Sequence, residues 1–82
     1  MEHDKTQRDP FIQIVEDHLA SGEPPETKAA YDALMAKDRS ASQAKALIAG
    51  AIRIETQEMM AKDRAFDSAH YKTLLDKILA DT

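Results

Sequence analysis

Apolar residues recur three or four positions apart in four stretches of the chain, which is the period of an α-helix that buries one face. The stretches run over residues 10–20, 25–37, 41–61 and 68–80 and are separated by short polar links. Short links favour antiparallel neighbours. The pattern predicts an all-α fold, either an irregular four-helix bundle or an array of antiparallel helical hairpins.

Residues that begin and end helices stand at the borders of these stretches. Asp9 precedes a proline and is a typical N-cap, and Gly22 can take the left-handed conformation that ends a helix. Ser40, followed three residues later by Gln43, has the spacing of a capping box, and Asp67 is suited to cap the last helix. These signals place the helix borders independently of the apolar pattern.

The chain has 82 residues, of which 43% are hydrophobic, so it has room for one modest core. Residues 1–8 carry no periodic pattern and are predicted to be a flexible leader before a single helical domain at 9–82. The chain lacks cysteine, which excludes disulfides, thiolate metal sites and thiol catalysis. A small core without disulfides is often supplemented by a metal or a second subunit.

Two ionisable residues fall among the apolar positions that should face the core. A helical projection places Glu55 near the centre of the apolar stripe of 41–61 and His18 on the apolar side of 10–20. Each needs a partner, because buried charges are normally paired. We expect them to meet each other, a hydroxyl or a backbone group, unless the bundle is open enough to hydrate them. Gly50, in the middle of the longest helix, is predicted to permit a close backbone contact.

A divalent metal is the alternative partner for these groups. His18 offers an imidazole, and Glu55 and Glu58 offer two carboxylates on one helix, a set that suits zinc, iron or manganese. The Glu-x-x-His element of di-metal carboxylate bundles is missing, because Glu58 stands where the histidine would be. The main expectation is therefore a domain with no cofactor.

Charge and hydropathy narrow the classes of partner. Eleven basic and fifteen acidic residues give a net charge of −4, and the basic residues are dispersed, which argues against direct binding of nucleic acid. The polar first ten residues do not resemble a signal peptide, and no apolar run reaches the length of a membrane span. We expect a cytoplasmic protein with no membrane contact.

Catalytic patterns are missing from the chain. The serines lie at predicted helix ends, where capping explains them, and no glycine-rich loop follows a strand. His70 falls near the margin of the last helix and is predicted to be solvated. We therefore predict no catalytic residue and no enzyme activity.

Tyr31 and Met35 project from the outer side of the second helix, and Met60 from the outer side of the third. Tyrosine and methionine are enriched in the cores of protein interfaces. These residues are the predicted partner-binding set, for another protein or for a second copy in a homodimer. The alternative is that they cover the edges of the chain's own core.

The stretch Val15-Glu16-Asp17-His18-Leu19-Ala20-Ser21-Gly22-Glu23-Pro24-Pro25-Glu26, with the later Phe66-Asp67 and Tyr71, resembles a bacterial family of small helical domains of unknown function. The resemblance covers roughly residues 9–79 and implies a compact all-helical bacterial domain without an established activity. Relatives look richer in histidine at positions such as Ile12 and Ala46, so a metal site in them would be incomplete here. Glu16 and Glu55 are the acidic positions that look similar.

These observations favour a non-enzymatic helical interaction module, for instance an acidic inhibitor or accessory subunit of a larger assembly. A metal-binding helical bundle that uses His18, Glu55 and Glu58 is the alternative.

Overall fold

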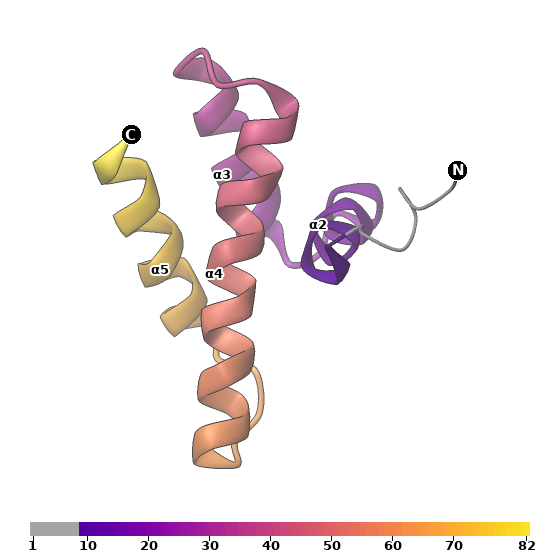
Figure 1. Ribbon diagram of the computed structural model, residues 1–82, viewed down its shortest axis with the longest axis vertical. Coiled ribbons are helices and arrows are strands. Elements are labelled where there is room, and N and C mark those ends of the chain that lie inside the picture. Colours follow the sequence, from indigo (N-terminus) through magenta and orange to yellow (C-terminus); the bar gives the residue numbers. More distant parts are fainter. Residues whose placement is uncertain (1–8) are drawn as a thin grey trace.

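The computed structural model describes residues 9–82, which form four helices and no strand. Each helix begins and ends within one residue of the predicted border, so the all-α four-helix fold is confirmed (Figure 1). The predicted flexible leader at 1–8 lies outside the described residues. The helices are α2 (Pro10–Ser21), α3 (Pro25–Ala36), α4 (Ala41–Lys62) and α5 (Ser68–Asp81).

The predicted capping residues act at the helix ends. The Asp9 carboxylate accepts a hydrogen bond from the Phe11 amide at 2.8 Å, and Gly22 takes a left-handed φ of 80° after α2. Ser40 and Gln43 form the reciprocal capping box of α4. These borders are fixed locally, because Asp9, Gly22 and the capping box each satisfy backbone groups only a few residues away.

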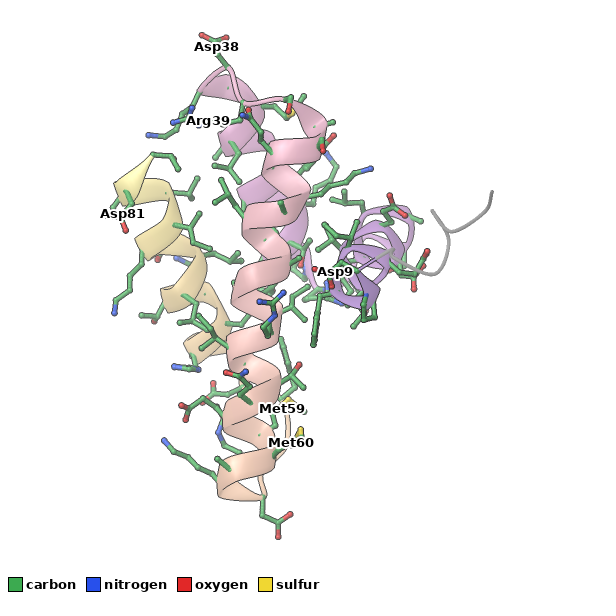
Figure 2. The ribbon with its side chains drawn as sticks, in the orientation of Figure 1. Asp9, Asp38, Arg39, Met59, Met60 and Asp81 are labelled. Carbon is green, nitrogen blue, oxygen red and sulfur yellow. The ribbon has the colours of Figure 1, made fainter. Side chains whose placement is uncertain are left out.

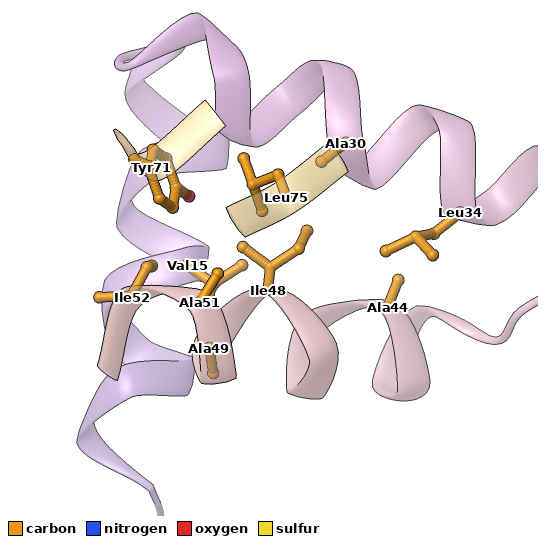
Figure 3. Close-up of a cluster of buried hydrophobic side chains, with 10 residues drawn as sticks. All are labelled: Val15, Ala30, Leu34, Ala44, Ile48, Ala49, Ala51, Ile52, Tyr71 and Leu75. Atoms are coloured by element: carbon orange, nitrogen blue, oxygen red, sulfur yellow. The ribbon is translucent and has the colours of Figure 1, made fainter. Parts of the chain in front are cut away.

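α4 is the spine of the molecule, and each of the other helices packs against it. α3 and α5 run alongside α4, whereas α2 crosses and is seen almost end-on in Figure 1. α4 supplies half of the buried apolar side chains, and they meet those of the other three helices (Figure 3). The core consists of Val15, Ala30, Leu34, Ala44, Ile48, Ala49, Ala51, Ile52, Tyr71 and Leu75.

Two details of the packing differ from expectation. Gly50 makes no close backbone contact, because a Cβ placed on it would meet nothing within 4 Å. The prediction for this glycine was wrong: it lies on the outer side of α4, beside an open groove. The second detail is Thr27, a polar residue in the first turn of α3 that is fully buried. Within residues 9–82, no helix combines the length and the apolar character that crossing a bilayer requires.

Candidate functional site

Glu55 is buried near the end of α4, with 1% of its side chain exposed, and four donors surround its carboxylate. The Arg64 guanidinium binds both oxygens, with Nη1 to Oε2 at 2.7 Å and Nη2 to Oε1 at 3.1 Å. The backbone N–H of Asp67 donates to Oε2 at 2.9 Å. His70 Nδ1 lies 2.7 Å from Oε1. We call Glu55, Arg64, Asp67 and His70 the linker cluster, because it joins α4, the linker and α5.

The cluster keeps Glu55 ionised despite its burial. Hydrogen bonds from Arg64, His70 and the Asp67 amide lower the pKa of the Glu55 carboxyl to about 2, against the opposing effect of desolvation. A carboxylate can only accept, so the Nδ1 atom of His70 carries the hydrogen in this contact. Each Glu55 oxygen thus has two donors, and the buried charge is compensated within the chain.

The linker cluster corrects one prediction and explains another. His70 was expected to be solvated, but its ring is about one-third exposed and its Nδ1 binds Glu55. The expectation that Glu55 points inward and needs a partner is confirmed. Neither Arg64 nor His70 was foreseen as that partner, because Arg64 lies in the linker, where helix periodicity carries no information, and His70 lies on another helix, α5.

His18 belongs to a different polar contact, between α2, α3 and α5. Its Nδ1 lies 2.9 Å from the Thr27 hydroxyl, which in turn bonds the hydroxyl of Tyr71. Burial lowers the pKa of His18 and raises the pKa of Tyr71, since both charged forms are disfavoured away from water. The expectation that His18 meets a hydroxyl is confirmed, and this chain of three side chains ties three helices together.

The three predicted metal ligands have separate partners. His18 bonds Thr27, Glu55 is held by the linker cluster, and Glu58 forms an ion pair with Lys62 at 3.0 Å. Lys62 also lowers the pKa of Glu58. Within residues 9–82, no three His, Cys, Asp or Glu side chains are grouped so that they could hold a metal ion. The structure does not bring His18, Glu55 and Glu58 together as a ligand set.

The predicted partner-binding residues are also dispersed. Tyr31 is half-buried and packs against the core, as the alternative interpretation expected. Met35 is 39% exposed beside the turn before α4, and Met60 is 77% exposed in the last turn of α4. Figure 2 shows Met60 at the opposite end of α4 from Asp38, whose N–H bonds the Met35 carbonyl. Met35 and Met60 therefore do not share one surface.

Apolar side chains gather instead in an open groove between the outer sides of α4 and α5. The groove has a volume of about 500 Å³. Ile54, which is 45% exposed, stands at one end, and Gly50 leaves the middle open. We call this the α4–α5 groove. It is lined by Ala46, Leu47, Gly50, Ala51, Arg53, Ile54, Leu74, Lys77, Ile78 and Asp81.

The charged side chains of the α4–α5 groove stand along its borders. Arg53 reaches towards α2, where it lies 3.4 Å from the Asp9 carboxylate and over the Phe11 ring. Lys77 and Asp81 are exposed on α5, and within residues 9–82 neither forms an ion pair. The groove has an apolar floor and, on its α5 side, one free charge of each sign. Sequence analysis did not identify it, because only the packing of α4 against α5 shows which apolar residues remain uncovered.

In comparisons with known proteins, no family model, no curated protein and no solved structure matches the chain. The geometry of the described residues is therefore the basis for any proposal about function.

Proposed function

We propose that this chain is a non-enzymatic helical protein–protein interaction module whose contact surface is the α4–α5 groove. The observation that carries the proposal is the gathering of half-exposed apolar side chains, Leu47, Ile54, Leu74 and Ile78, along one groove between two helices. A groove of this kind accepts the apolar face of another helix.

The size of the α4–α5 groove suits such an occupant. Its α4 side extends over residues 46–54, or about 12 Å along the helix axis, which is roughly two helical turns. Ala46 and Gly50 keep the floor low, so that the backbone of a docked helix can approach closely. An apolar floor with charged borders is also the composition of a protein interface, whose core is depleted of charge and whose rim is polar.

The polar clusters support an interaction module over a catalyst. The Glu55 carboxyl, whose pKa is lowered to about 2, is enclosed by four donors of its own chain. The hydroxyls of Thr27 and Tyr71 bond each other within the core. Both clusters connect helices, and the linker cluster joins α4 to α5, the two helices that form the groove.

Site-specific photo-crosslinking tests the proposal. The photoreactive residue p-benzoylphenylalanine is placed at Ile54, in the groove, and separately at Ala20, an exposed position of α2 that does not line it. Cells producing each variant are irradiated, and adducts are identified by mass spectrometry. We expect a protein adduct at position 54, with this chain or with another, that is missing at position 20. If both positions give the same background, the α4–α5 groove is not a contact surface.

A further inference from the structure

We infer that the occupant of the α4–α5 groove is a second copy of this chain, packed groove against groove about a two-fold axis beside Gly50. The two α4 helices would run antiparallel. The inference rests on the proposed function and specifies its partner.

The outer side of α4 is complementary to a second copy of itself when Gly50 is the centre. We call the residues on this side the outer stripe: Gln43, Ala46, Gly50, Ile54 and Gln57. In a two-fold contact, residue i of one copy meets residue j of the other, and j meets i. Antiparallel helices centred on residue 50 therefore pair residues whose numbers add to 100. This rule places the exposed Ile54 against the exposed Ala46 of the other copy, so that a large side chain faces a small one. The two-fold axis repeats this pairing, so Ile54 of each copy faces Ala46 of the other.

The polar ends of this stripe follow the same rule. Gln43 and Gln57 are both exposed and are seven residues before and after Gly50. The two-fold axis places each opposite the other. Gln43 uses its Oε1 in the capping box of α4, which leaves its amide NH₂ group to donate to the carboxamide of Gln57. The apolar centre of the contact is thus closed at each end by a pair of amides.

Gly50 is suited to the position on the axis. Two helices related by an axis through one residue bring that residue against its own copy, where any side chain is duplicated. Nothing lies within 4 Å of the place where a Cβ would stand on Gly50, so the surface of α4 is open there. A glycine allows the two backbones to approach more closely than an alanine does.

The charges on α5 provide the complementarity that selects a second copy. The groove places residues 74–81 of α5 alongside residues 46–54 of the antiparallel α4, so both segments share roughly one midpoint. The two-fold axis crosses both helices at this midpoint. Measured along α5, the midpoint lies about 2 Å from the position halfway between Lys77 and Asp81. Lys77 then faces Asp81 of the other copy, and Asp81 faces its Lys77. Two charges that lack an ion pair within residues 9–82 gain one each across the contact.

Charge reversal tests this pairing. Wild-type protein, Lys77→Asp, Asp81→Lys and the double variant are studied by sedimentation velocity over a range of protein concentrations. We expect a concentration-dependent dimer for the wild type, at least about tenfold weaker association for each single variant, and recovery in the double variant. A wild-type chain that stays monomeric, or a double variant as weak as the single ones, would overturn the inference. Circular dichroism of each monomer confirms that the exposed substitutions leave the fold intact.

Disulfide trapping tests the position of the axis. Because the chain has no native cysteine, any disulfide must form through the introduced residue. Under mild oxidation, Gly50→Cys should form a covalent dimer with itself, because the axis brings its Cα atoms within disulfide range. The control Ala20→Cys should crosslink much more slowly. Gln43→Cys and Gln57→Cys should crosslink efficiently when mixed and poorly when each is alone. A Gly50→Cys rate equal to that of Ala20→Cys would contradict the antiparallel arrangement.

The photo-crosslink at position 54 separates failure of this inference from failure of the proposed function. An adduct with a different protein, together with a monomeric wild type, refutes the second copy and retains the interaction module. Lack of any adduct specific to position 54, together with a monomeric wild type, refutes both. An adduct between two copies supports both.

Discussion

α4 and α5 meet in two regions that reverse the usual distribution of polar and apolar side chains. At the linker end, the charged Glu55 is buried among Arg64, His70 and the Asp67 amide. On the outer side of the same two helices, the apolar Ile54 is exposed in the α4–α5 groove. Glu55 and Ile54 are neighbours in sequence, so the direction in which each side chain points decides its surroundings.

The difference shows that partners, more than polarity, decide where a side chain is stable. Glu55 is buried because four donors replace the water it loses. Ile54 is exposed because no element of residues 9–82 covers the outer side of α4 at that point. The linker cluster is complete within the chain, whereas the groove is open. Stability should therefore depend on the first region and association on the second.

Among the polar side chains, the largest effect is expected where the buried carboxylate is removed. Glu55→Gln leaves Arg64 and the Asp67 N–H without their charged acceptor, and we expect the free energy of unfolding to fall by about 2 to 3 kcal/mol. Arg64 and His70 are partly exposed, so water can replace some of the lost contacts. Chemical denaturation measures the change.

Glu58→Gln is the matched control, since Glu58 forms only an ion pair with the exposed Lys62. Its unfolding midpoint should stay close to that of the wild type. Repeating both measurements with zinc and with a chelator separates the internal role of Glu55 from metal ligation. The Glu55→Gln loss should be the same in either condition, and a metal-dependent loss would instead support the His18, Glu55 and Glu58 ligand set.

Acid should weaken the linker cluster through the same carboxylate. The pKa of Glu55 is about 2 in the folded chain and near 4.5 when the chain is unfolded, so the unfolded state binds more protons between these values. Stability from this group is fully present above pH 4.5 and is lost as the pH falls towards 2. Urea titrations at pH 6, 4 and 3 should show that loss. In Glu55→Gln this part of the pH dependence should disappear, and an unchanged pH profile would refute the assignment.

A smaller loss is expected at the hydroxyl that joins α3 to α2 and α5. Thr27→Val keeps the size of the side chain but removes the hydrogen bonds to His18 and Tyr71. We expect a loss of about 1 to 2 kcal/mol, because two partly or fully buried polar groups lose their partner. Thr73→Val is the control, because Thr73 is exposed and bonds only a carbonyl of its own helix. Equal losses in the two variants would show that the buried hydrogen bonds of Thr27 contribute no more to the free energy of unfolding than the exposed one of Thr73.

Gly50→Ala should stabilise the monomer and weaken its association. Apart from the adjoining backbone of its own helix, the added Cβ has no atom within 4 Å, and alanine is better than glycine inside a helix by roughly 0.5 to 1 kcal/mol. Thermal unfolding at low protein concentration measures the gain, and Ala46→Gly should show a loss of similar size. A destabilised Gly50→Ala monomer would mean that the surface of α4 at this point is not open.

The smallest effect on the fold is expected at the exposed apolar residue. Ile54→Ser should change the free energy of unfolding of the monomer by less than about 0.5 kcal/mol, since most surface substitutions have little effect. It should still weaken association through the α4–α5 groove. Ile48→Ala, in the core of the same helix, should cost about 3 kcal/mol and provides the contrast. A large loss of monomer stability in Ile54→Ser would place Ile54 in the core.

The helices could be predicted from the sequence because their signals are local. Asp9, Gly22, Ser40 and Asp67 act on backbone groups a few residues away, so their chemistry is visible in a short window. The inward direction of Glu55 follows from helix periodicity for the same reason. These features depend on neighbours in the sequence.

The partners of the inward polar groups could not be predicted in the same way. Arg64 reaches Glu55 only because the linker turns back after Asp63, which takes a left-handed φ of 51°. The contact between Thr27 and Tyr71 joins residues 44 positions apart. The α4–α5 groove is still less accessible to sequence analysis, because it depends on which side of α4 the other helices leave uncovered. Met35 and Met60 were chosen from separate helix projections, which give no information on the distance between them.

The linker cluster has a consequence for the order in which the chain folds. Its hydrogen bonds span only nine, twelve and fifteen residues, whereas the contacts that attach α2 to α4 span 29 and 44. Closing a short loop costs less entropy than closing a long one, and local contacts form faster. The hairpin of α4 and α5 can therefore close at a small entropic cost, held by one buried carboxylate, before the long-range ion pairs attach α2 to α4.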